Sequence, residues 1–551
     1  MELELVIGVT GHRNLPKNSQ VELQQKVTKY LTAITEQYPF LQLRIVTGMA
    51  VGADWLVSQA ALEMQQQGYN IRTTAVLPMP LAMYKQDFSP REQAQLETLL
   101  TQIKDQQGRV IHLNPQVERD LCYQNLSSYL TNKSDLLLSL WDLQNSDAPG
   151  GTAFTTKMAF SPQYRMHHLT HKTVQWTQDT SVPTYVIPVE GQAEGYLTSI
   201  KPISLQPAIP KTLVDLIAQL SKLAKALATS EQNSLLPLNK LSAKEGASAD
   251  QDRISEHFAH FDRLANFTQQ QVKHAHYTVA GLTVLISLLF LVFAKILPSL
   301  IVLSAYVITF VLGFIWYKWR NPNKIKANYT LYRAIAEALR IEFFWQQRAL
   351  IGDNASQSVA NSIPANFSAK QQVVKKVLKQ ASLAGSSAGC ESINLADLKS
   401  IWLHEQLAYY QAAHAKLTKQ HKCSEWLVKL SIFIPVGLLC LLFIPVCYQF
   451  LTTQEWAGVE VKNWLVFTSA LLPLSAAAVE MMANNNSVKE LLTQYQSSAK
   501  LTQQAVDILA GCDNDSHANK VLLEIGHALS LEHFIWAQTT QQKELSAAHG
   551  G

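Results

Sequence analysis

Three short loops rich in glycine and threonine hold the side chains best suited to chemistry in this sequence. Each loop follows an apolar run of strand length, and glycine there lets backbone N–H groups approach a bound anion closely. A loop that opens a helix adds the favourable field of the helix N-terminus. The residues that we expect to bind a ligand are Gly8, Thr10, Gly11, His12 and Arg13 in or after the first run, Thr47, Gly48, Gly52 and Asp54 after the second, and Asp142, Gly150, Gly151 and Thr152 after the fifth.

Phosphate and ribose are the groups that these side chains suit. Arg13 can donate two parallel hydrogen bonds to a phosphate. Asp54 or Asp142 can accept hydrogen bonds from ribose hydroxyls. Tight turns alone would explain the glycines of one loop, whereas three such loops at strand ends favour a ligand site.

Alternating strand and helix patterns through residues 1–190 position these loops. Mostly apolar strands separated by helices are typical of a parallel sheet covered on both faces. We therefore predict an α/β fold, a Rossmann-like doubly wound parallel sheet, with its ligand outside the carboxyl ends of the strands. The expected strands are residues 3–9, 41–46, 71–77, 109–113, 134–142 and 184–188.

The N-terminal third of the chain resembles the SLOG superfamily, Rossmann-like domains related to the cytokinin-activating LOG enzymes and to the Smf-type DNA-processing protein. The motifs that carry the resemblance are VTGHRNL, TGMAVGADWLVSQAA, SDLLLSLWD and GGTA. The resemblance implies that residues 1–200 form a sensing domain that binds a nucleotide or its derivative at the strand ends.

The catalytic motif of the LOG enzymes is not reproduced in this sequence. Those enzymes cleave the glycosidic bond of a nucleoside monophosphate with a glutamate beside a PGGxGTxxE motif. Here Gly150, Gly151 and Thr152 are followed by Ala-Phe-Thr-Thr-Lys, without the glutamate. We therefore expect binding rather than catalysis, no catalytic residue, and no cofactor besides the nucleotide-derived ligand.

Four long apolar runs later in the chain have the length of membrane-spanning helices. A hydrocarbon core of about 30 Å needs about 20 helical residues. The runs cover residues 277–294, 296–317, 430–454 and 463–479. Short turns separate the first from the second and the third from the fourth, so we predict two membrane hairpins.

The flanking cations predict the orientation of these hairpins. Lysine and arginine gather on the cytoplasmic side of membrane helices. We expect a multi-pass protein of the inner (cell) membrane with both termini and the central region in the cytoplasm. The cations that set this orientation are Lys318, Arg320, Lys324 and Lys326 after the second run, and Lys416, Lys419, Lys422 and Lys429 before the third.

Polar helices extend the spans into the cytoplasm. We expect a helical linker at 201–252, a helix with the first hairpin and a following helix over 253–350, a loop or insert at 351–396, and a helix, the second hairpin and further helices over 397–551. The helix YRAIAEALRIEFFWQQ (332–347), directly after the first hairpin, resembles the SLATT-type membrane modules, predicted effectors of bacterial conflict systems.

Both resemblances together imply a membrane effector. A cytoplasmic SLOG domain would bind a nucleotide second messenger and trigger pore opening or membrane disruption, as a homo-oligomer in antiphage defence. One alternative is a membrane-anchored nucleotide or nucleoside-monophosphate hydrolase that uses Asp54 or Glu92. Another is a transporter with a regulatory head, although no glycine-rich break or buried charge marks its spans.

Composition and histidine spacing exclude several other classes. The net charge of +4 is not concentrated in one tail, so we expect no nucleic-acid polymer as partner. Six cysteines without a CxxC pair argue against a disulfide scaffold or a zinc ribbon. His167, His168 and His171 lack a nearby carboxylate or cysteine, so we expect no metal there. They lie in an insert, residues 153–182, that could cover the ligand.

Overall fold

The chain forms two compact units in the computed structural model. Unit 1 comprises residues 1–234, 248–256 and 351–390, and unit 2 comprises residues 235–247, 257–350 and 391–551. The structure describes residues 3–113, 118–146, 148–168, 181–190, 193–228, 249–348, 350, 359–362, 373–378, 393–485, 487–512 and 514–542.

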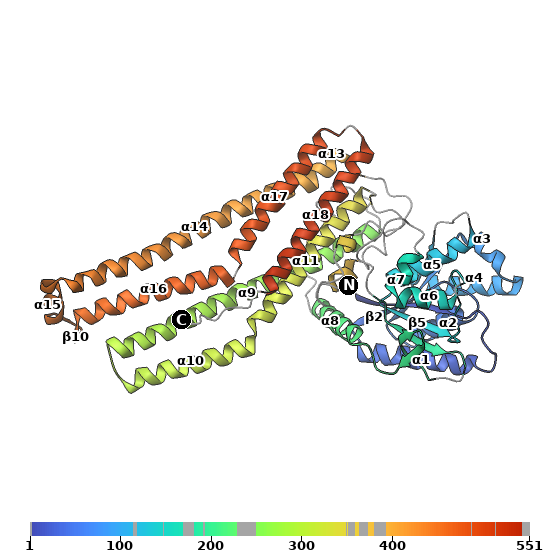
Figure 1. Cartoon of the computed structure of the whole chain (residues 1–551), viewed down its shortest axis with the longest axis horizontal. Helices are drawn as coiled ribbons and strands as arrows, with labels where there is room; N and C mark the ends of the chain where they lie inside the picture. Colours follow the sequence, from blue (N-terminus) through green and yellow to red (C-terminus); the bar gives the residue numbers. More distant parts are fainter. Residues whose placement is uncertain are drawn as a thin grey trace. The chain divides into compact units, whose positions relative to one another are not determined.

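An eight-stranded sheet organises unit 1 (Figure 1). Its strands are β1 (Leu3–Gly11), β2 (Leu41–Thr47), β3 (Ile71–Leu77), β4 (Arg109–His112), β5 (Leu136–Trp141), β6 (Thr184–Pro188), β7 (Gly195–Ile200) and β8 (Ile203–Gln206). Their order across the sheet is β4-β3-β2-β1-β5-β6-β7-β8. All pairs from β4 to β6 are parallel, and β7 and β8 add an antiparallel edge. The predicted α/β fold with a mainly parallel sheet is thereby confirmed.

Helices between the strands bury the sheet on both faces, which explains why β2 and β5 are buried along their whole length. These helices are α1 (Gln20–Gln37), α2 (Ala53–Gln66), α3 (Leu81–Tyr84), α4 (Pro90–Asp105), α5 (Arg119–Lys133), α6 (Thr152–Phe160) and α7 (Pro162–His167), with α8 (Lys211–Ala228) after the sheet. Ser89 and Glu92 form a capping box that starts α4.

Two parts of unit 1 differ from the sequence-based expectation. Strands β7 and β8 were not predicted, and β8 with α8 occupies the range expected to be a helical linker. The expected insert at 153–182 begins as α6, whose residues from Thr152 to Ala159 are all buried. α6 combines apolar residues with threonines and a lysine without the one-sided pattern that marks a surface helix, and it packs into the core on every side.

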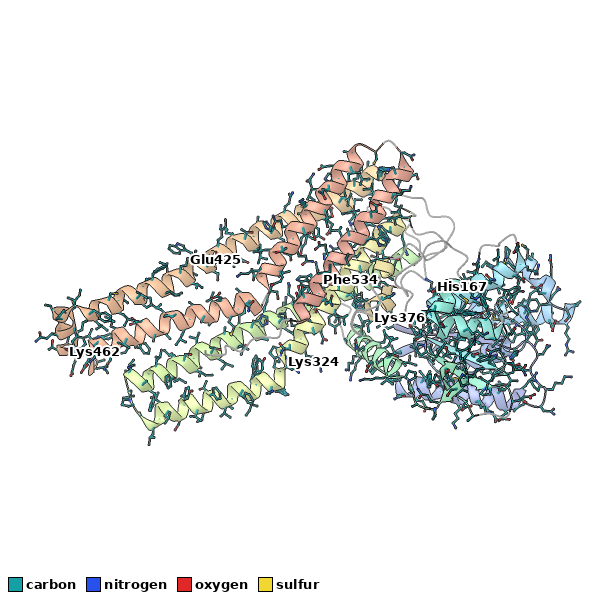
Figure 2. All side chains as sticks on the ribbon, in the orientation of Figure 1. His167, Lys324, Lys376, Glu425, Lys462 and Phe534 are labelled. Atoms are coloured by element: carbon teal, nitrogen blue, oxygen red, sulfur yellow. The ribbon has the colours of Figure 1, made fainter. Side chains whose placement is uncertain are left out.

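Unit 2 is built from long helices arranged as two hairpins with further helices (Figures 1 and 2). They are α9 (Ala249–Lys295), which begins in unit 1, α10 (Leu300–Arg320), α11 (Pro322–Gln347), α13 (Leu395–Leu398), α14 (Glu405–Cys440), α15 (Pro445–Thr453), α16 (Val461–Asn485), α17 (Val488–Ala510) and α18 (Asp515–Gln542). The short strands β9 (Glu455–Trp456) and β10 (Val459–Glu460) form the turn before α16.

Four helical stretches among the described residues are long and apolar enough to cross a membrane, and their apolar windows are 0–22% buried within the chain. Exposed apolar side chains at that density are costly in water and stable in lipid. The third run, expected as one span over 430–454, is not one continuous helix. α14 ends at Cys440, Ile444 is extended, and α15 starts at Pro445, which has no N–H to continue a helix.

Candidate functional site

The first and fifth strands meet at the point where the order of the sheet reverses. From β1, the chain adds β2, β3 and β4 on one side and then β5 and β6 on the other. In doubly wound sheets, ligands usually bind outside the carboxyl ends of the strands at such a reversal point. His12 and Asp142 lie there, with His12 Nε2 3.0 Å from Asp142 Oδ1.

The loop after β2 packs tightly against the loop after β1. Gly52 has φ +91°, and a Cβ there would lie 2.3 Å from the carbonyl oxygen of Arg13 and 2.4 Å from that of His12. The N–H of Ala53, the first residue of α2, donates to the His12 carbonyl at 3.0 Å. Only glycine fits this position, because both the space and the positive φ exclude a side chain.

Asp54 is buried beneath this loop and shapes it. Its Oδ2 accepts a hydrogen bond from the N–H of Ala50 at 3.2 Å, and Thr47 also bonds to the carboxyl. Burial raises the pKa of Asp54 to about 6, although these hydrogen bonds and Arg13 oppose the rise. The carboxyl is 6% exposed and engaged by its own loop. It therefore fits the expected ribose contact less well than Asp142, which is exposed.

A cluster that sequence reasoning missed adjoins Arg13. The Arg13 guanidinium lies 5.7 Å from the centre of the Tyr123 ring, and its Nη2 donates to the Tyr123 hydroxyl at 3.4 Å. That hydroxyl donates in turn to Asp87, which also pairs with Arg119 at 2.7 Å. Burial lowers the pKa of Arg13, whereas the hydrogen bond to Tyr123 raises it, and the net effect is a raised pKa. Tyr123 lies in a helix without a recognisable motif, so the sequence carried no signal for it.

The loop after β5 completes the site. Gly150 has φ +75°, and a Cβ there would lie 2.3 Å from the Cβ of Tyr123. Gly151 is the N-cap of α6 and has no side chain to cap that helix. The first N–H groups of a helix without a capping side chain can donate to an anion.

The predicted site residues fall into two groups. One group is at least partly exposed and can touch a ligand: Gly11, His12, Arg13, Gly52, Asp142, Gly150 and Gly151. The other is buried and supports the loops: Gly8, Thr10, Thr47, Gly48, Asp54 and Thr152. Within the second group, a Cβ on Gly8 would lie 2.2 Å from the Ser134 hydroxyl oxygen, which makes Gly8 a packing glycine.

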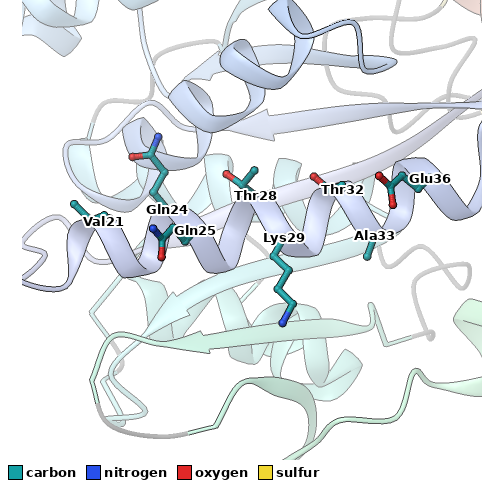
Figure 3. A pocket seen from close by; sticks show the side chains of 8 residues that line it. All are labelled: Val21, Gln24, Gln25, Thr28, Lys29, Thr32, Ala33 and Glu36. Atoms are coloured by element: carbon teal, nitrogen blue, oxygen red, sulfur yellow. The ribbon is translucent and has the colours of Figure 1, made fainter.

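Two other features carry less chemistry. A shallow groove runs along α1 and is lined only by side chains of that helix, from Val21 to Glu36 (Figure 3). His167 and His168 have ring centroids 5.1 Å apart, and His171 lies outside the described residues. Within the described part of the chain, no group of three histidine, cysteine or acidic side chains could hold a metal.

The candidate site is thus a cluster of side chains at the strand ends, His12, Arg13 and Asp142, with Tyr123 beside them and two helix N-termini next to it. Comparison with protein-family models and with curated proteins finds no significant match to this chain.

Proposed function

We propose that this protein is a membrane effector gated by a nucleotide-derived second messenger. Unit 1 binds the ligand, and the helices of unit 2 respond by opening or disrupting the bilayer. The observation that carries the proposal is the pairing of His12 with Asp142 at the reversal point of the sheet, beside Arg13. Four candidate membrane helices in the same chain supply the output.

The side chains divide the recognition of a nucleotide between them. Arg13 and the N–H groups at the starts of α2 and α6 suit the phosphates. Asp142 is exposed and accepts hydrogen bonds, as ribose hydroxyls require. Tyr123 offers an aromatic ring at the edge of the site, next to Arg13.

A nucleotide hydrolase is the second candidate, and the raised pKa of Asp54 favours it. An acid with a pKa of about 6 can exchange a proton near neutral pH. Against this role, the carboxyl is held by the N–H of Ala50. Glu92, the other candidate acid, is occupied in the capping box with Ser89, whose bonds lower the pKa of Glu92. Binding therefore explains the geometry better than turnover.

The test uses the full chain in lipid nanodiscs with AMP, ADP, cyclic AMP and ADP-ribose. Thermal shift reports binding, and mass spectrometry of the same samples reports whether the ligand stays intact. A shift with intact ligand supports the sensor. Cleavage by the wild type that Asp54→Asn abolishes would establish the hydrolase instead.

Arg13→Gln should weaken the binding of any phosphate-bearing ligand in this panel by about tenfold or more, because a charge-assisted hydrogen-bond donor is lost. Arg91→Gln is the matched control, since Arg91 is an exposed arginine of α4 in the same unit. Equal affinities of the two variants would contradict the assignment of Arg13.

The membrane response is measured as dye release from vesicles that contain the protein. Addition of a ligand that binds should speed release, which requires the ligand to bind the open and closed states with different affinity. We further propose that several copies assemble to form the opening, since four helices enclose little space, and that the setting is antiphage defence.

A further inference from the structure

The chain leaves unit 1 and returns to it around the first hairpin. Residues 248–256 belong to unit 1 and open α9, and residues 351–390 belong to unit 1 again after α11 has ended. The next residues lead into the second hairpin through α13 and α14. The connection between the two hairpins is therefore anchored on the unit that carries the candidate ligand site.

A short helical segment, residues 373–378, is the anchored part of this connection. All of its side chains are buried, and the apolar ones are 0–1% exposed: Val373, Val374, Val377 and Leu378. Side chains buried to this extent are held in place by their packing within unit 1.

A buried ion pair fixes this segment to the sheet. The ammonium group of Lys376, labelled in Figure 2, contacts the carboxylate of Asp135, and the two side chains are 5% and 8% exposed. Asp135 directly precedes β5. Its Oδ2 also accepts from the N–H of Val6 in β1 at 2.8 Å, and its own N–H donates to the Val6 carbonyl at 2.9 Å. Asp135 thus joins three segments: β1, β5 and residues 373–378.

The candidate ligand site lies at the other ends of the same two strands. His12 follows β1 and Asp142 follows β5, and the two side chains meet at the carboxyl ends. Lys376 is held at the amino end of β5, next to β1. A ligand that shifts β1 against β5 would change the bonds that Asp135 shares between them.

We propose that residues 373–378 are a latch, which docks on the sheet while the site is empty and is released when ligand binds. Release frees the connection between the hairpins and lets the second hairpin move. This inference rests on the proposed function for its trigger. Docking through the ion pair, in contrast, is testable without any ligand.

Hydrogen exchange of the full chain in nanodiscs, without ligand, tests the docking. Lys376→Met keeps much of the side-chain length and removes the charge, so the Asp135 carboxylate loses its cation and keeps only the hydrogen bond from Val6. Amides 373–378 should then exchange about tenfold faster or more, because breaking a buried ion pair destabilises what it holds. Lys211→Met is the matched control at an exposed lysine of unit 1. Equal exchange in the two variants would overturn the latch.

Asp135→Asn is the second variant, since its amide oxygen can still accept from Val6 while the charge is removed. It should also speed exchange at 373–378. Amides of β1 and β5 should remain slow in both variants. Loss of protection in those strands in both variants would show that the pair holds the sheet itself, and would also overturn the latch.

Dye release from vesicles tests whether the docking restrains the membrane helices. Lys376→Met should leak severalfold faster than the wild type and Lys211→Met without ligand. Faster exchange with unchanged leakage would overturn the restraint. A failure of every nucleotide in the panel to shift the melting of the wild type would count against the proposed function alone, because the latch experiments contain no ligand.

Discussion

Gly52 shows how one residue can hold two loops of the candidate site together. Its positive φ and the absence of a Cβ allow the loop after β2 to touch the backbone of His12 and Arg13. The position of the Arg13 backbone depends on this contact. Residues that never touch a ligand can therefore determine whether the site exists.

Gly52→Ala should destabilise unit 1 by about 3 kcal/mol or more, the sum of positive-φ strain and a backbone clash. It should also abolish the thermal shift by any nucleotide that binds the wild type. Gly68→Ala is the control, since Gly68 has φ +93° but nothing within 4 Å of the added carbon. Gly68→Ala should lower the free energy of unfolding of unit 1 only by the strain of the positive φ, about 1–2 kcal/mol. Equal losses in thermal unfolding would refute the packing argument.

At this scale the sequence predicted that the loops after β1, β2 and β5 lie together, but not which of their side chains are accessible. Asp54 and Asp142 both follow strands, and the pattern gives them equal roles. Asp54 is buried because it is the second residue of α2 and faces the loop before it, whereas Asp142 lies beyond the end of β5. Such differences depend on tertiary packing, which residue spacing does not encode.

At the scale of elements, a buried charge cluster joins the helices of both hairpins. Glu337 of α11 lies 2.6 Å from Arg333 and 3.1 Å from Arg340, and Arg333 also pairs with Asp262 of α9 at 2.9 Å. His533 of α18 lies 3.7 Å from Glu337. A small cavity beside them is lined from α11, α14, α17 and α18. The spacing of Arg333, Glu337 and Arg340 along the sequence indicates ion pairs within α11, but it carries no signal for contacts with other helices.

Glu337→Gln should destabilise unit 2 by about 3–5 kcal/mol, because it leaves two arginines without their shared carboxylate in a buried place. The measurement is thermal unfolding in detergent. Glu425→Gln is the control: Glu425 pairs with His421 on the surface of α14 and is 52% exposed. The melting temperature of Glu425→Gln should equal that of the wild type. An equal fall in melting temperature in Glu337→Gln and Glu425→Gln would contradict the role of burial.

The stability of unit 2 should depend on pH in the acid range through the carboxyl group of Glu337. This residue lies in α11, after the apolar run of α10. Burial alone would raise the pKa of Glu337, but Arg333 and Arg340 lower it to about 2, below the ordinary 4.5. A carboxyl with a lowered folded-state pKa contributes its full stabilisation above pH 4.5 and loses it as the pH falls towards 2. Glu337→Gln should therefore lose less stability than the wild type across that window.

Strands were easier to predict than the connections between them. β2, β5 and β6 are buried along their whole length, and their mostly apolar sequences indicate this directly. β7 and β8 form a short antiparallel edge whose outer residues are partly exposed, so no apolar run marks them. The break before Pro445 lies inside an apolar run, where composition alone indicates one helix.

At the scale of the whole molecule, the orientation in the membrane remains a prediction from charge. The turn between the third and fourth apolar runs should face outward and the lysine-rich approach to α14 inward. In cells that make a variant without the native cysteines, Gln454→Cys should react with a membrane-impermeant maleimide, since this exposed C-cap residue of α15 is the last of the third run, next to that turn. Lys419→Cys, at an exposed position in the lysine-rich part of α14, should react only after permeabilisation. The reverse pattern would invert the topology.

The discontinuity of unit 1 was not predictable from sequence, because a buried six-residue segment within 351–396 carries no long-range signal. That range was expected to be a loop or insert, and the structure describes residues 359–362 and 373–378 of it as helical turns. The burial of Lys376 depends on a contact with a residue hundreds of positions away. That residue is Asp135.

This discontinuity also dictates an order of events during synthesis. Lys376 leaves the ribosome about 120 residues after Glu256, a delay on the order of 10 s at ordinary elongation rates. Throughout that interval Asp135 is without its buried cation. The first hairpin is complete before the segment that docks on unit 1 has been made. The whole first hairpin is therefore synthesised before unit 1 has all the residues that complete its fold.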